Sequence, residues 1–128
     1  MSFAGEIEAF NRKALKAANM VIRGTALDLS SSIIKRTPVK TGRLRGNWQT
    51  EINGFPISEI NSTASQATAK NRQVINTAKI KDAIYFVNNL PYAGEIERGS
   101  SSQAPQGMVA VTINAFKKLV AKNARKNR

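Results

Sequence analysis

The first third of the chain carries an apolar stripe at helical spacing. Hydrophobic side chains recur three and four positions apart from Phe3 onward, which is typical of an amphipathic helix. Ser2 is a suitable N-cap residue. Pro38 pushes the residue before it out of the helical region, and it therefore ends the helix. We expect one long helix over residues 3–35, with a weak point at Gly24.

The middle of the chain alternates between strand-like and turn-like segments. Hydrophobic and β-branched residues favour strands over three segments, 44–52, 74–80 and 83–90. The last of these is the most crowded with β-branched and aromatic side chains, as a central strand is. Between the first two strands, residues 61–73 contain no large apolar side chain. We therefore expect a sheet within residues 44–90 that is interrupted by a long mobile loop over 54–73.

A second amphipathic helix is expected near the end of the chain. Apolar residues again recur at helical spacing over 107–124, although the β-branched run 109–113 also suits a strand. Before it, residues 92–98 are expected to form a short helical turn that ends at Gly99. The order of elements predicts a single α+β domain over residues 1–128. Its antiparallel sheet of three to four strands would be flanked by a long N-terminal helix and a C-terminal helix.

Composition narrows the chemistry that the chain can perform. It has no cysteine and no histidine, which excludes disulfides, most zinc sites, Ser-His triads and Cys-His dyads. Only Glu6 with Glu8, and Glu95 with Glu97, are acids close in sequence, and residues two apart point to different sides of a helix. Residues 41–46 have neither dinucleotide-binding nor P-loop spacing. We therefore expect no enzymatic activity, no cofactor and no metal.

The charge balance is strongly basic. Twenty Lys and Arg residues stand against eight Asp and Glu residues, a net charge of +12 that attracts polyanions such as nucleic acid. Eleven of the basic residues lie in two acid-free blocks, 35–45 and 117–128. These blocks are either solvated faces or surfaces for an anionic partner, since a protein that needs only solubility intersperses the two signs. The start of the chain lacks a signal-peptide pattern, and no apolar run is long enough for a membrane span. We expect synthesis in the cytoplasm and no membrane partner.

Three segments together resemble a known family. Residues 37–45, Thr-Pro-Val-Lys-Thr-Gly-Arg-Leu-Arg, and the following Trp48 resemble the TPVxTGxLRxxW signature of small neck and tail-completion proteins of tailed phages. Residues 84–99 resemble the Y-x-x-N-x-x-x-Y-A-x-x-x-E-x-G segment of the same proteins. Residues 103–109 resemble the QAPxGMV segment that precedes their last helix. The order and spacing also agree, and with the long first helix the resemblance covers nearly the whole chain.

The resemblance implies a structural virion protein of the phage head–tail junction. Such a protein acts in the neck, in tail completion or as a tail terminator, and its fold is similar to that of tail terminators. It implies assembly with copies of itself into a ring, with sixfold symmetry favoured and twelvefold symmetry as the alternative. The further partners would be adjacent head-closure or connector proteins, tail-tube or terminator proteins, and DNA in the channel. The expected location is the virion, after assembly in the host cytoplasm.

Candidate contact residues come from these segments and from the basic blocks. Gly42 permits a turn with positive φ, and Arg43 and Arg45 can pair bidentately with carboxylates; a plain helix-to-strand connector is the alternative. Glu97 and Gly99 are either partner contacts or parts of a packed helical turn. The rival function is a basic nucleic-acid-binding domain that places Arg43, Arg45 and the C-terminal helix on phosphates. The full set of candidates is Lys40, Thr41, Gly42, Arg43, Arg45, Tyr92, Glu97, Gly99, Gln103, Lys117, Lys118, Lys122 and Arg125.

Overall fold

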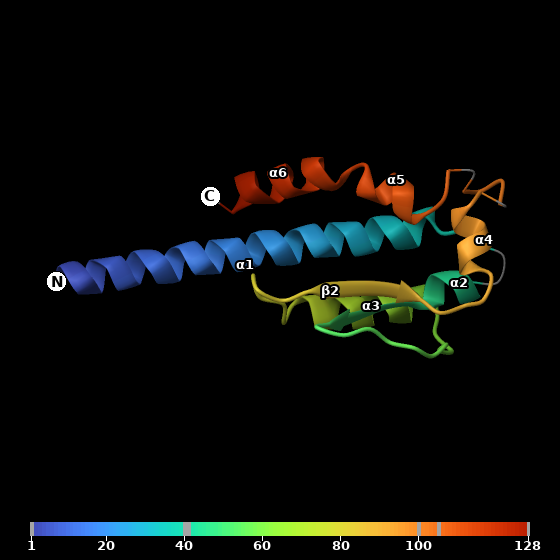
Figure 1. The fold of residues 1–128 in the computed structure, drawn as a ribbon, viewed down its shortest axis with the longest axis horizontal. Coiled ribbons are helices and arrows are strands. Elements are labelled where there is room, and N and C mark those ends of the chain that lie inside the picture. Colours follow the sequence, from blue (N-terminus) through green and yellow to red (C-terminus); the bar gives the residue numbers. More distant parts are fainter. Residues whose placement is uncertain (1, 40–41, 100, 105, 128) are drawn as a thin grey trace.

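One long helix is the axis around which the other elements are arranged (Figure 1). The computed structural model describes residues 2–39, 42–99, 101–104 and 106–127. The elements in chain order are α1 (Phe3–Arg36), α2 (Arg43–Gly46), β1 (Trp48–Ile52), α3 (Ala64–Ile75), β2 (Ile84–Asn88), α4 (Ala93–Glu97), α5 (Val109–Ile113) and α6 (Phe116–Lys126). Helices α5 and α6 lie along one side of α1, and the strands and α3 lie along the other. The predicted α+β class, long N-terminal helix and C-terminal helix are confirmed.

Helix α1 runs without a break over 34 residues. Ser2 Oγ accepts from the backbone N–H of Gly5 (3.0 Å), which confirms the predicted N-cap, and Thr37 is the C-cap. The weak point predicted at Gly24 is wrong, because Gly24 lies inside the regular helix, where a Cβ would collide with the side chain of Asn123 in α6. This glycine allows the two helices to approach closely. No helix in the described part of the chain is both long and apolar enough to cross a bilayer.

The described residues form a sheet of two strands. Strands β1 and β2 are antiparallel, with Trp48 opposite Asn88, so the prediction of three to four strands is not confirmed. Residues 44–46, which we expected at the start of the first strand, belong to helix α2 instead. The strand predicted over 74–80 is wrong, because the fully buried Ile75 closes the last turn of α3 and turns follow it. A short apolar run there fits either a helix end or a strand.

Helix α3 occupies part of the region where we expected a mobile loop, so that prediction is wrong for residues 64–73. Thr63 Oγ1 accepts from the N–H of Gln66 (3.1 Å), and Gln66 Oε1 accepts from the N–H of Thr63 (2.9 Å). This reciprocal pair is a capping box, which stabilises the first turn. The helix buries three residues at a spacing of four, Ala67, Asn71 and Ile75. These three side chains are a small, a polar and a large apolar one, and the helix lies against both β1 and α1.

The C-terminal helix predicted over 107–124 is divided into α5 and α6. Residues 114–115 separate the two helices, and the run 109–113 is helical rather than a strand. That run is mostly β-branched, which weakens a helix, and the break follows directly after it. Helix α6 then packs on α1, where the buried Asn123 donates from Nδ2 to Asp28 Oδ2 (3.0 Å).

The hydrophobic core lies near the C-terminal end of α1, beside α2 and α4 (Figure 1). Its buried members are Ile33, Ile34, Leu44, Trp48, Leu90, Ala104 and Met108. Trp48, Leu90 and Met108 come from the three segments that carry the family resemblance. Burial of apolar surface therefore holds these three segments together.

Replacing Gly46 with alanine is expected to destabilise the fold. A Cβ at Gly46 would collide with the backbone carbonyl oxygen of Ser62. Because backbone has to move, we expect Gly46→Ala to lower the free energy of unfolding by about 1–3 kcal/mol, measured by urea or thermal unfolding. Gly94→Ala is the matched control, since Gly94 is also helical and its nearest neighbour, Arg98 Nη1, would lie at 3.4 Å. Equal losses in the two variants would contradict the close approach at Gly46.

Candidate partner-contact surface

The end of α1 is joined to β1 through a single hydroxyl group. Thr37 Oγ1 donates to the carbonyl oxygen of Ile33 (2.6 Å) and accepts from Trp48 Nε1 (2.8 Å). Thr37 is 1% exposed and Trp48 is 6% exposed, so these groups are shielded from water. The hydroxyl therefore satisfies a buried indole N–H and fixes the ring against the last turn of α1.

Both candidate arginines of the first segment are engaged within the chain. Arg45 donates from Nε to the carbonyl oxygen of Thr37 (2.7 Å) and from Nη2 to that of Lys35 (3.0 Å). It thereby caps the carbonyl end of α1. Arg43 Nη2 lies 2.7 Å from Glu59 Oε2, in an ion pair at the surface. These contacts favour the connector interpretation for Arg45. Arg43 does pair with a carboxylate, but that carboxylate belongs to the same chain.

Glu97 holds the start of α5. Its Oε1 accepts from the amides of Met108 and Val109 (both 2.7 Å), and its Oε2 accepts from the amide of Ala110 (2.9 Å). Burial raises the pKa of Glu97, but the three amide donors together hold it below the ordinary glutamate value. Gly107 has φ of +87°, and a Cβ there would lie 2.8 Å from Glu97 Oε2. The contacts of Glu97 therefore fit the packed-turn interpretation.

Two further candidates also fix neighbouring segments. Gly99 has φ of +92°, and its N–H donates to the carbonyl oxygen of Ile96 (3.0 Å), so the predicted turn over 92–98 and its terminal glycine are confirmed. Gln103 Oε1 accepts from the N–H of Val39 (3.0 Å), and its Nε2 reaches the Val39 carbonyl oxygen (3.5 Å). Gln103 thus ties the third segment to the first.

A surface depression of about 390 Å³ lies where the three segments meet. We call it the corner depression, and it is lined by Pro38, Gly42, Leu44, Tyr92, Ile96, Ser101 and Gln103. It brings together the candidates Gly42, Tyr92 and Gln103, one from each segment. Gly42 has the predicted positive φ, +80°, and Tyr92 is 37% exposed. The candidates Lys40 and Thr41 lie outside the described residues.

Packing of α6 on α1 brings parts of the two basic blocks together. A second depression of about 390 Å³, which we call the basic groove, is lined by Asp28, Ser31, Ser32, Lys35, Arg36, Leu119 and Lys122. Lys122 Nζ lies 3.3 Å from Asp28 Oδ2, so its charge is partly compensated. The other α6 candidates, Lys117, Lys118 and Arg125, are exposed on the same helix outside this lining. Arg43 and Arg45 do not contribute to the groove.

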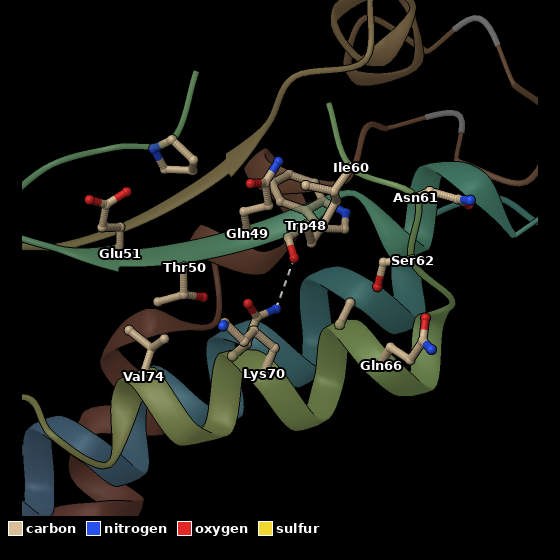
Figure 2. Close-up of a pocket in the computed structure, with 13 residues that line it drawn as sticks. Trp48, Gln49, Thr50, Glu51, Ile60, Asn61, Ser62, Gln66, Lys70 and Val74 are labelled. Carbon is tan, nitrogen blue, oxygen red and sulfur yellow. Dashed lines mark hydrogen bonds between the residues drawn. The ribbon is translucent and has the colours of Figure 1, made fainter. Parts of the chain in front are cut away.

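A cavity of about 680 Å³ lies between β1 and α3 (Figure 2). Thr50 on the strand faces Val74 on the helix across it, whereas Glu51 points to the opposite side of the strand, and Asn71 Nδ2 donates to the carbonyl oxygen of Trp48 (3.1 Å). Glu51 is the one carboxylate among the described lining residues, so this cavity offers no carboxylate pair for acid–base chemistry. Within the described ranges, no group of three or more His, Cys, Asp or Glu side chains is placed to hold a metal ion.

The buried Asn47 and the half-buried Asn88 make internal contacts that the sequence analysis missed. Asn47 is 0% exposed; its Nδ2 donates to the carbonyl oxygen of Arg43, and its Oδ1 accepts from the N–H of Ile60 (both 2.9 Å). Asn88 Nδ2 donates to the carbonyl oxygen of Leu44 (2.9 Å). Asn47 precedes the buried Trp48, and Asn88 lies in the most apolar strand. An asparagine in such a position indicates internal hydrogen bonds, because a shielded amide group needs partners within the protein.

No protein-family model, no curated protein and no solved structure matches this chain. The family resemblance therefore stays a prediction that rests on the residues of the three segments. The structure adds their arrangement, because the segments share a core and line one depression.

Replacing Glu97 with glutamine is expected to weaken the fold in a pH-dependent way. The pKa of Glu97 lies below the ordinary value of 4.5, so its carboxylate stabilises the fold above that pH, and this stabilisation is lost as the pH falls through the folded-state pKa. Near neutral pH we expect Glu97→Gln to cost about 1 kcal/mol, the typical value of a helix cap. The difference in the free energy of unfolding between this variant and the unsubstituted chain should shrink below about pH 4.5. Urea unfolding at several pH values measures it. Glu95→Gln is the control, and the same pH-dependent loss in both variants would contradict the capping role.

Proposed function

We propose that this chain is a structural virion protein of the head–tail junction of a tailed phage, acting in the neck, in tail completion or as a tail terminator. It acts as a subunit of a homo-oligomeric ring that joins the tail to the head. The observation that carries the proposal is the convergence of the three family-resembling segments on one core and one depression. Residues that are far apart in sequence there build a single surface, which is what a contact with another protein requires.

The residues around the corner depression divide into supports and contacts. The polar groups of Thr37, Arg45 and Glu97 form hydrogen bonds within the chain, so these residues support the surface. Gln103 lines the depression but also acts as a support, because its amide is bonded to the Val39 backbone. Tyr92 lines the depression and remains exposed to solvent. A rigid frame with an exposed aromatic side chain is typical of a protein-binding surface, because little conformational entropy is lost on binding.

The ring is proposed to be sixfold, with twelvefold symmetry as the alternative. Its neighbours would be head-closure or connector proteins on one side and tail-tube or terminator proteins on the other, with DNA in the channel.

A nonsense mutation in the phage gene that encodes this chain is expected to stop virion completion at the junction. Electron microscopy of the lysates should then show DNA-filled heads beside unjoined or abnormally ended tails. A plasmid-borne copy of the chain should restore infectious particles. Normal infectious virions from the nonsense mutant would overturn the proposal.

Complementation by variants separates the corner depression from the rest of the surface. The two tyrosines match in exposure, since Tyr92 is 37% exposed at the depression and Tyr85 is 40% exposed on β2. Tyr85 also packs on the Phe55 ring and lies opposite Glu51, so its replacement by Asp tests the harsher structural change. We expect Tyr92→Asp to lower the plaque count at least about tenfold, the effect of about 1.4 kcal/mol at an interface. Tyr85→Asp should complement more nearly like the unsubstituted chain. Equal complementation by the two variants would place the contact elsewhere.

The basic groove supports a second candidate function, a nucleic-acid-binding domain. Lys35 and Arg36 from one basic block and Lys122 from the other line the same depression. Cations that converge in this way concentrate positive potential along the path of a phosphate backbone. The compensation of Lys122 by Asp28 weakens this potential, which is why we place this function second.

The salt dependence of duplex DNA binding tests this second function. If the groove binds phosphates, log K should fall linearly with log salt, and Lys35→Gln with Arg36→Gln should make the slope shallower by about two, one for each lost contact. Lys13→Gln with Lys16→Gln removes the same charge from the other half of α1 and is the control. An absence of binding at low salt, or equal slopes in the two double variants, would contradict a role for the groove.

A further inference from the structure

The N-terminal arm of α1, which we define as residues 3–18, extends alone past the rest of the fold (Figure 1). Phe3 is 77% exposed, Phe10 is 70% exposed and Ile7 is 44% exposed. Among the described residues, α1 first hydrogen-bonds to the body just after the arm, where Asn19 Oδ1 accepts from the N–H of Ile80 (2.9 Å). Most helical stability in proteins comes from tertiary packing, which the arm lacks on these exposed side chains, and exposed large apolar side chains favour a partner.

Three of the four large apolar side chains of the arm, Phe3, Ile7 and Phe10, have the spacing of a coiled-coil seam, and the fourth, Leu15, lies off it. The spacing of four and three continues through Ala14 and Ala17 to Val21, directly after the arm. This strict seven-residue repeat is the pattern of a helix that packs along another helix. The next seam position is Gly24, where α6 already packs against α1. The seam therefore covers the exposed part of α1 and stops where the body begins.

The charges of the arm are complementary to an arm that runs in the opposite direction. The acids Glu6 and Glu8 lie near the tip, and the bases Arg12, Lys13 and Lys16 lie nearer the body. Two parallel arms would place like charges side by side, whereas two antiparallel arms place the acidic tip of each beside the basic part of the other. Glu6 and Lys13 both flank the seam, at equivalent positions of successive repeats, and such positions meet across an antiparallel pair.

Side-chain size selects one register for this antiparallel pair. When Ile7 of one arm lies opposite Phe10 of the second, Phe3 lies opposite Ala14, so the large ring at each tip meets a small residue. Glu6 of each arm then lies beside Lys13 of the other. The two bodies sit at opposite ends of the pair, so they do not collide.

We propose that the arm pairs antiparallel with the arm of a second copy of this chain. This inference does not rest on the proposed function. The corner depression includes Pro38, just after the other end of α1, so a dimer through the arms leaves it free. The two proposals can fail independently, because the proposed function is tested on virions and the arm pairing is tested by the mass of the purified chain.

Sedimentation equilibrium of the full chain over a range of concentrations tests the pairing. We expect the average mass to rise toward twice that of the monomer, and Phe10→Glu to keep the mass at that of the monomer. Leu15→Glu is the matched control, because Leu15 is 55% exposed on the same arm but lies off the seam. Circular dichroism at high concentration should show less helix for Phe10→Glu than for Leu15→Glu. A monomer at every concentration, or equal effects of the two substitutions, would overturn the proposal.

Disulfide trapping tests the direction of the pair. The chain has no cysteine, so Glu6→Cys and Lys13→Cys each introduce a single thiol. We expect a mixture of the two proteins to form a disulfide-linked dimer under mild oxidation, well above the amount that either forms alone. Dimers formed by each protein alone would indicate parallel arms. Absence of any disulfide dimer from chains that associate would indicate that the arm binds the body of its neighbour, and both outcomes overturn the antiparallel pair.

Discussion

The two hydrogen bonds of the Thr37 hydroxyl are the interactions on which the rest of the structure depends. The hydroxyl donates to the last turn of α1 and accepts the indole N–H of Trp48, and both residues are buried. Without this acceptor, the indole N–H would lie unsatisfied in the core, which costs about 1–3 kcal/mol. The bond sets the position of β1 against α1, and β1 in turn positions β2 and α3.

The same region shows how a strongly basic chain uses scarce acids and polar side chains. Glu97 satisfies three amides at the start of α5, and Arg45 satisfies two carbonyl groups at the end of α1. Helix ends carry backbone groups without partners inside the helix, so a region where several helices end needs such side chains. Charged groups that the sequence offers to a partner are therefore partly used within the fold, whereas Lys117 and Lys118 of α6 remain exposed.

Local patterns predicted the parts of the fold that depend on local interactions. The apolar stripe, Ser2 and Pro38 fixed the bounds of α1 closely, and Gly99 marked the end of α4. Helix α3 was missed although its capping box at Thr63 is readable from the sequence, because its buried face uses small and polar residues. Long-range bonds, such as that between Gln103 and the backbone of Val39, leave no local pattern. The corner depression depends on such bonds, so the sequence indicated its residues but not their convergence.

The placement of Met108 in the core has a consequence for synthesis of the chain. Met108 packs in the same cluster as Ile33 and Trp48, yet it leaves the ribosome long after them. Contacts between such distant residues form late. Trp48 therefore stays partly exposed in the nascent chain until the last quarter of the chain has left the ribosome. A chain that ends before residue 103 would lack both Gln103 and Met108, so it would lose part of the corner depression together with part of the cover over Trp48.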